Sequence, residues 1–148
     1  MMKILIDADA CPVINIVIDL CKQYKLQCLI FCDTAHKLQD QYAETIICDK
    51  GNDSVDYTLV NYACAGDIVI TQDYGLASMC LAKLSKILHQ DGWQYTNDNI
   101  EALLLQRHES RKFRQAGGRT KGPSKRKDIQ NQHFKSILEE LIQQSLQG

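Results

Sequence analysis

Short apolar runs that alternate with helix-like stretches are the feature that most restricts how this 148-residue chain can fold. The runs are rich in Ile, Leu, Val and Cys, and they are continuous rather than alternating, which is typical of strands covered on both faces of a parallel sheet. We expect these strands at Lys3–Asp7, Leu26–Cys32, Glu44–Cys48, Asp67–Thr71 and Lys86–His89. The helix-like stretches are Pro12–Tyr24, Asp53–Ala63, Tyr74–Leu84, Asn97–Arg114 and Asp128–Leu146.

Strands that alternate with helices predict right-handed crossover connections and an α/β fold, a three-layer α/β/α sandwich with a mostly parallel sheet. The length predicts one domain over residues 1–148. Pro12 suits the first position of a helix, because its missing N–H would have no partner there. The stretch at about 128–146 has apolar side chains three and four residues apart, so we expect an amphipathic C-terminal helix that docks on the domain.

The seven cysteines are odd in number and include no C-x-x-C pair, which argues against a disulfide framework or a zinc site. We expect them to be small buried hydrophobic residues in a reducing compartment. The sequence shows no secretory leader pattern, and no apolar run approaches the roughly 20 residues that span a bilayer. A cytoplasmic protein without membrane contact is therefore expected.

Acidic and hydroxyl residues follow three of the expected strands. They are Asp7 and Asp9 after the first strand, Asp53 and Asp56 after the third, and Thr71 and Asp73 after the fourth. Parallel strands end at the same edge of a sheet, and binding sites form outside those carboxyl ends. The sequence therefore predicts that these acids meet at one edge.

Some of these acids also have a structural explanation. Asp53 and Asp73 precede expected helices, where an N-cap contributes about 1 kcal/mol to stability. Asp9 fits such a role poorly if Pro12 is the first helical residue. Asp7, at the end of a buried strand, has no capping role.

Several carboxylates at one edge repel one another unless a cation lies between them. A hard divalent cation such as Mg²⁺ or Mn²⁺, with oxygen ligands, is the natural partner. Such a cation polarises a phosphoryl oxygen and generates hydroxide near neutral pH, so the pattern favours hydrolysis of a phosphodiester.

Four motifs resemble the YaiI/YqxD family of bacterial proteins over nearly the whole chain. They are "DADACPV" (Asp7 to Val13), "TQDYGLAS" (Thr71 to Ser78), "GWQYTNDNI" (Gly92 to Ile100) and a tail with Gly122, Pro123, Asp128 and Phe134. This family is similar to PIN-like nuclease domains. The resemblance implies a three-layer fold and an acidic divalent-metal site that cuts RNA or DNA.

The resemblance also implies a role for individual residues. Asp7 would be the central metal ligand, Asp73 the acid after strand four and Asp56 the acid on the helix after strand three. Asp9 would join this set, and Thr71 would orient a water or a metal-bound carboxylate. These five residues are the predicted catalytic set, and the four aspartates are the predicted metal ligands.

A basic segment follows these motifs. Between Arg107 and Lys127 nine Lys or Arg stand against one acid, a net charge of +8 that leaves about −9 on the rest of the chain. The glycine-rich loop at about 115–127 lies within this segment, and we expect it to be exposed. The predicted contacts to nucleic acid, RNA before DNA, are Arg111, Lys112, Arg114, Arg119, Lys121, Lys125, Arg126 and Lys127. The alternative is that half of these charges form only the solvated face of the helix that ends near Arg114.

Two other functions compete with a nuclease. A D-x-D after the first strand also begins haloacid-dehalogenase-like phosphatases, in which the first Asp is the nucleophile. That mechanism needs a separate lysine and a late acidic pair, and no Asp-Asp or Glu-Asp pair follows Asp73. The second alternative is a catalytically silent PIN-like protein that binds nucleic acid through its basic loop.

Overall fold

A six-stranded sheet in the order β3-β2-β1-β4-β5-β6 forms the centre of the molecule. The computed structural model describes residues 2–9, 11–33, 40–48, 54–119 and 125–148. The strands are β1 (Lys3–Asp7), β2 (Gln27–Asp33), β3 (Glu44–Cys48), β4 (Ile68–Ile70), β5 (Lys86–Leu88) and β6 (Gln94–Tyr95). Neighbouring strands are parallel except β5 and β6, which are antiparallel. The expected mostly parallel sheet is confirmed.

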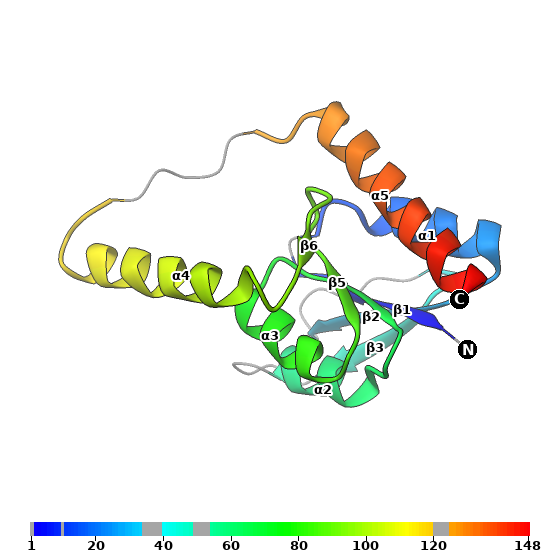
Figure 1. Cartoon of the computed structure of the whole chain (residues 1–148), viewed down its shortest axis with the longest axis horizontal. Coiled ribbons are helices and arrows are strands. Elements are labelled where there is room, and N and C mark those ends of the chain that lie inside the picture. The colour runs from blue at the N-terminus through cyan, green and yellow to red at the C-terminus, as the bar shows by residue number, and fades with distance from the viewer. Residues whose placement is uncertain (1, 10, 34–39, 49–53, 120–124) are drawn as a thin grey trace.

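Helices cover both faces of this sheet and produce the predicted three layers (Figure 1). They are α1 (Ile14–Tyr24), α2 (Ser54–Tyr62), α3 (Tyr74–Ala82), α4 (Ile100–Gln115) and α5 (Asp128–Gln147). Helices α1 and α5 pack on one face, and α2 and α3 pack on the other. Helix α4 starts at the buried Ile100 and then extends away from the sheet. None of the helices in the described ranges is long and apolar enough to cross a membrane.

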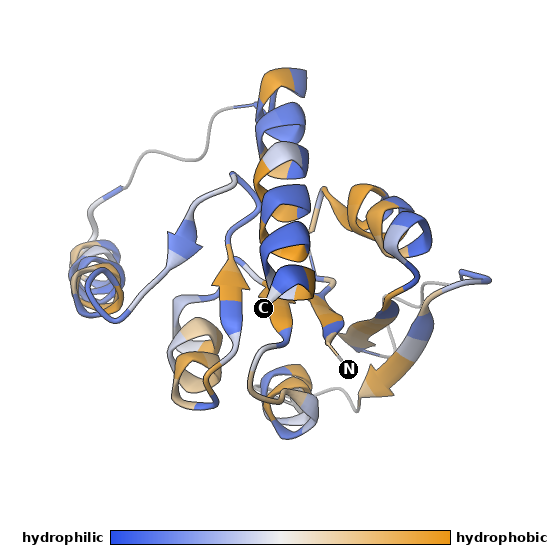
Figure 2. Ribbon diagram, turned by 45° about the vertical axis from the view of Figure 1, so that its right-hand side comes forward, coloured by the Kyte–Doolittle hydropathy of each residue, from blue (hydrophilic) through white to orange (hydrophobic). Residues whose placement is uncertain are grey.

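Strand β1 is apolar along its length because both of its faces are covered. Ile4 and Ile6 belong to the core beneath α1 and α5, whereas Leu5 belongs to the core beneath α2 and α3, and all three are fully buried. Figure 2 shows the same arrangement, with hydrophobic central strands between helices that each have a hydrophilic side. The continuous apolar pattern of the sequence thus reflects two cores rather than one.

Helix α5 docks on the sheet as its amphipathic pattern predicts. Phe134, Leu138 and Ile142 lie on its inner face and are completely buried in the core shared with α1. On its flank, Glu139 accepts a hydrogen bond of 2.7 Å from the hydroxyl of Tyr24, at the end of α1. The C-terminal helix is therefore part of the fold.

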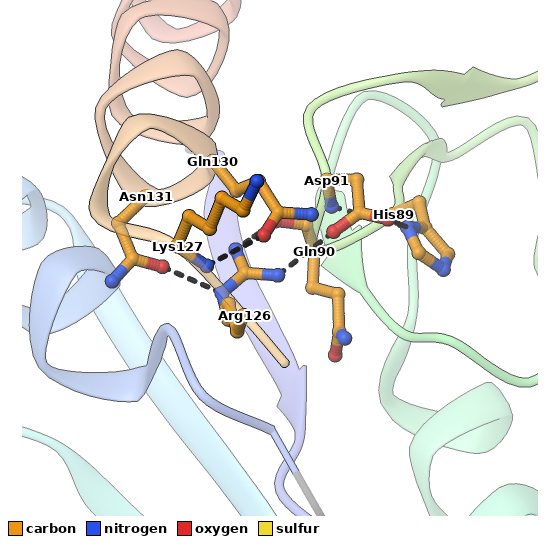
Figure 3. A network of polar contacts seen from close by, with 7 residues as sticks. All are labelled: His89, Gln90, Asp91, Arg126, Lys127, Gln130 and Asn131. Atoms are coloured by element: carbon orange, nitrogen blue, oxygen red, sulfur yellow. Dashed lines mark hydrogen bonds and ion pairs between the residues drawn. The ribbon is translucent and has the colours of Figure 1, made fainter. Parts of the chain in front are cut away.

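Arg126, just before α5, connects that helix to the turn between β5 and β6 (Figure 3). Its guanidinium donates from Nη1 to Asp91 Oδ1 at 2.8 Å, from Nη2 to the Gln90 carbonyl at 2.7 Å and from Nε to Asn131 Oδ1 at 2.6 Å. Only 20% of its side chain is exposed. The expectation of an exposed basic loop is therefore wrong for Arg126, because this side chain fastens the start of α5 to the sheet layer.

Helix α1 begins two residues later than expected. Its first turn is closed by the Val17 N–H, which donates to the Val13 carbonyl at 3.0 Å, so Val13 is the N-cap. Pro12 lies in the preceding turn, where the Cys11 N–H donates to the Ala8 carbonyl at 3.2 Å. The prediction that Pro12 is the first helical residue is wrong, because this turn separates the strand end from the helix.

All seven cysteines are free thiols, as expected. Five of them are buried, and Cys28 and Cys32 share one face of β2 in the core beneath α1 and α5. Cys64 is exposed, so the prediction of a buried hydrophobic residue is wrong at that position. It follows α2 in the loop before β4, outside either core.

Candidate active site

Asp7 and Thr71 meet at the carboxyl ends of two neighbouring strands. Ile6 of β1 is in register with Ile70 of β4, which places the next residues of both strands side by side. The buried Thr71 hydroxyl donates a hydrogen bond of 2.8 Å to Asp7 Oδ2 and accepts one of 3.0 Å from the Asp73 N–H. One hydroxyl thereby connects the two segments that carry Asp7 and Asp73.

Asp73 caps helix α3. Its Oδ1 accepts hydrogen bonds from the backbone N–H groups of Gly75 at 2.8 Å and Leu76 at 3.2 Å, the geometry of an N-cap. Arg107 Nη1 on α4 lies 3.2 Å from the same oxygen. The capping alternative is confirmed, and it does not remove the acid from the sheet edge. Sequence reasoning missed the partnership with Arg107, because 34 residues separate the two and no pattern indicates how α4 crosses α3.

Burial raises the pKa of the Asp7 carboxyl to about 6. The carboxylates of Asp73 and Asp9 raise this pKa further, while the Thr71 hydroxyl and the Asp9 backbone N–H, which both donate to Asp7, lower it. The Asp9 side chain itself is exposed. The two acids of the D-x-D motif therefore differ. Asp7 is partly buried, whereas Asp9 has an exposed side chain, donates its backbone N–H to Asp7 and adds negative charge nearby.

Asp56 lies in the first turn of α2 and is half-buried. Burial raises the pKa of the Cys80 thiol on α3 to about 12, and the charges of Asp56 and Asp7 contribute to this rise. The charge of Asp56 therefore acts on the same part of α3 as the charge of Asp7 does. Asp53, the neighbouring candidate, lies outside the described residues.

The carboxylate oxygens at this edge are ligands of the kind that Mg²⁺ and Mn²⁺ prefer. Within residues 2–9, 11–33, 40–48, 54–119 and 125–148, however, no three His, Cys, Asp or Glu side chains are arranged so that they could hold a metal ion. Two acids already have protein donors, Thr71 for Asp7 and Arg107 for Asp73. The donor chemistry fits a hard cation, and the ligand set Asp7, Asp9, Asp56 and Asp73 stays a prediction.

An aromatic wall borders the acidic edge on its β5–β6 side. His89 and Trp93 stack with ring centroids 4.4 Å apart, and Tyr95 contacts Tyr74 with centroids 6.0 Å apart. Burial lowers the pKa of His89, which favours the neutral form of its ring. Among the described residues the buried Tyr95 hydroxyl has no hydrogen-bond partner, and the charges of Asp73 and Asp7 add to the burial that raises its pKa. Tyr95 belongs to the motif "GWQYTNDNI", but the sequence does not indicate its place beside the acids.

The surroundings of Cys11 disfavour a nucleophilic role for this thiol. Burial and the nearby Asp7 charge raise the pKa of its thiol to about 11. The reactive form of cysteine is the thiolate, which this environment disfavours at neutral pH.

The predicted nucleic-acid contacts are distributed over α4 and the segment before α5. Arg111, Lys112, Arg114, Arg119, Lys125 and Lys127 are exposed, Arg126 is half-buried, and Lys121 lies outside the described residues. Arg107 contacts Asp73, and the charge of Arg126 acts on Cys11, which also feels the charge of Asp7. Positive charge thus borders the acidic edge from two elements.

A family model described as "Uncharacterized BCR, YaiI/YqxD family" matches residues 5–144. The chain belongs to the YaiI/YqxD family. The relatives, described as UPF0178 proteins, include one from Natranaerobius thermophilus that is 47% identical over 143 residues, covering 97% of each chain. One from Exiguobacterium sibiricum is 45% identical over 141 residues, covering 95% of this chain and 96% of its own. One from Ruminiclostridium cellulolyticum is 44% identical over 147 residues, covering 99% and 96%. No solved structure matches the chain.

Two of the motifs that predicted the YaiI/YqxD family lie at the acidic edge. "DADACPV" contains Asp7 and Asp9, and "TQDYGLAS" contains Thr71, Asp73 and the first residues of α3. The predicted family is thus confirmed, whereas its likeness to PIN-like nucleases stays a prediction. What members of the YaiI/YqxD family do must be inferred from the site itself.

Proposed function

We propose that this protein is a divalent-metal-dependent nuclease that hydrolyses phosphodiester bonds of RNA, or of DNA. The proposal is carried by the Thr71 hydroxyl, which joins the segments of Asp7 and Asp73 at the ends of β1 and β4. Around it, the charges of Asp73 and Asp9 oppose ionisation of the partly buried Asp7. A bound cation would relieve this opposition, because an opposite charge nearby stabilises carboxylates.

The predicted ligands would be Asp7, Asp9, Asp56 and Asp73, which offer the oxygen donors suited to Mg²⁺ or Mn²⁺. When bound, such a cation supplies a polarised phosphoryl oxygen and an activated water. The protein's own residues supply position. Thr71 fixes the rotamer of Asp7, and the cap on α3 fixes that of Asp73, so neither carboxylate needs to be ordered when substrate arrives.

Positive charge beside the acids supports a nucleic acid as the substrate. Arg107 contacts Asp73 from α4, and the exposed cations of that helix continue away from the site. An anionic strand lying along these cations would be brought to acids that otherwise repel it. RNA is the proposed substrate before DNA because of the likeness to PIN-like nucleases.

The test is cleavage of fluorescent single-stranded RNA and DNA oligonucleotides by the pure protein with Mn²⁺ or Mg²⁺, with EDTA as control. Asp7→Asn and Asp73→Asn should each lower turnover by orders of magnitude. Asp73→Asn is informative because Asn caps a helix as well as Asp does, so α3 is preserved while the charge is lost. Asp19→Asn, an exposed change on α1, is the matched control and should cleave like the wild type. Cleavage that persists in EDTA or in Asp7→Asn would refute the proposal.

Binding without hydrolysis is the second candidate function. It is favoured by one observation: the Asp73 carboxylate already has two backbone donors and an arginine. Oligonucleotides that bind with micromolar affinity but stay intact in Mn²⁺ would establish this function instead.

A further inference from the structure

A polar groove lies between the start of α3 and one face of α4. It has a volume of about 210 Å³ and is lined by Tyr74, Gln106, Arg107, Ser110 and Arg114. Arg107, Ser110 and Arg114 are three, four and seven positions apart, and Gln106 is four positions before Ser110, so these residues of α4 lie along the same side of the helix. None of these five described lining residues carries a carboxylate. Its donors therefore suit an anion that extends along the helix.

The groove begins at the candidate active site. Arg107 belongs to its lining and places Nη1 3.2 Å from Asp73 Oδ1, while 42% of the Arg107 side chain remains exposed. A Cβ at Gly75 would lie 3.3 Å from Asp73 Oδ1 and 3.4 Å from Arg107 Nη1, so glycine permits this close approach of α4 to α3. A ligand in the groove would thus lie directly beside Asp73.

The dimensions of the lining indicate the class of ligand. Since an α-helix rises about 1.5 Å per residue, Arg107 and Arg114 are separated by about 10 Å along α4. Guanidinium groups are forked donors that match phosphate oxygens. Ser110 adds a neutral donor between them, and Gln106 adds one next to Arg107. Tyr74 adds an aromatic ring of the kind on which bases and sugars pack.

We propose that this groove binds consecutive backbone phosphates of a single-stranded nucleic acid and holds the strand beside Asp73. The proposal rests on the proposed function, since the bound strand is the substrate whose adjacent phosphodiester reaches the acidic edge. It distinguishes Arg107 and Arg114 from the other cations of α4. In this proposal Arg114 contacts a backbone phosphate of the bound strand, whereas Arg111 lies outside the groove lining and adds only to the general positive charge of the helix.

The experiment measures binding in EDTA, so that it does not depend on cleavage. The probe is a 5′-fluorescein hexanucleotide of uridine, followed by anisotropy over a range of salt concentrations. Arg114→Gln should weaken binding by about 3- to 10-fold and reduce the slope of log affinity against log salt by about 0.7, the value for one phosphate contact on a single strand. Arg114→Lys, which keeps the charge, should restore most of the slope.

Arg111→Gln is the matched variant, because it removes the same charge from an exposed position on the same helix. It should weaken binding by less than half as much as Arg114→Gln does. Lys135→Gln on α5 should bind like the wild type. A hexanucleotide with an uncharged methylphosphonate backbone should not compete. Equal effects of the two arginine variants on binding, or competition by the uncharged strand, would refute the proposal that the groove binds backbone phosphates.

Cleavage assays of the same variants in Mn²⁺ separate this proposal from the proposed function. Binding that depends on Arg114, without cleavage, supports the groove and refutes hydrolysis. If the wild type cleaves, and the Arg111 and Arg114 variants weaken binding equally, hydrolysis is supported and phosphate binding in the groove is refuted.

Discussion

The Asp7→Asn variant should be more stable than the wild type at pH 7 in the absence of divalent metal. The pKa of Asp7 rises from 3.8 to about 6 on folding, chiefly through burial. One pKa unit corresponds to about 1.4 kcal/mol, so ionising this buried carboxyl lowers the free energy of unfolding by about 3 kcal/mol. Asn carries no charge but keeps one acceptor oxygen for the Thr71 hydroxyl. Loss of the other acceptor costs about 1 kcal/mol, which leaves a net gain of about 2 kcal/mol.

The sign follows from proton binding. Between pH 4 and pH 6 the folded state holds a proton on Asp7 that the unfolded state has released, so the stability of the wild type falls as the pH rises. Below pH 4 both states are protonated and the advantage of Asn disappears. Urea unfolding in EDTA at pH 4 and pH 7, with Asp19→Asn as the surface control, measures the difference directly.

A difference between variant and wild type that is the same at both pH values would refute the reasoning, because burial of the charge would then cost nothing. The effect of a divalent metal on stability is measured with the same proteins. Mn²⁺ should raise the melting temperature of the wild type through preferential binding to the folded state, and Asp7→Asn should lose most of that rise.

Three further substitutions test the contacts that hold the layers together, each by urea unfolding. Arg126→Ala removes the hydrogen bonds between α5 and the β5–β6 turn and should cost about 1–3 kcal/mol. Gly92→Ala should cost a similar amount, because Gly92 has φ +93° and a Cβ there would lie 2.6 Å from His133 Cδ2. Asp67→Ala should cost about 3–5 kcal/mol, because it leaves the Lys3 ammonium, now 2.6 Å from the buried carboxylate, without this partner. Wild-type stability of the Arg126 or Asp67 variant would show that its contacts are not formed in solution, and wild-type stability of Gly92→Ala would show that His133 does not lie so close to Gly92.

The strands were predictable where the chain is apolar on both faces. The bounds of β1 and β3 match the expectation, and β2, β4 and β5 differ by a residue or so at their ends. Strand β6 was missed, because two residues, Gln94 and Tyr95, are too few to show a period. The start of α4 was placed too early, since Thr96 and Asn99 exchange side-chain to backbone hydrogen bonds that form a turn before the helix.

Part of the candidate site could also be predicted, because strand register alone brings Asp7 beside Thr71. The partners that come from distant elements could not. Arg107 reaches Asp73 only because α4 crosses the start of α3, and that crossing depends on packing at Gly75. Arg126 was predicted to be part of an exposed loop because a sequence shows its charge. The sequence does not show that Arg126 pairs with Asp91, which lies 35 residues away.

The position of β1 has a consequence for the order in which the molecule assembles. This strand is synthesised before its neighbours, yet it lies between β2 and β4, and one of its faces is covered by α5. It can pair with β2 early, but its second edge stays open until residues 68–70 are made. The face beneath Phe134 and Leu138 stays uncovered until residue 128 and beyond have emerged. We expect ribosome-bound chains that end at residue 127 to be degraded by protease much faster than the full chain, because their central strand still exposes apolar surface.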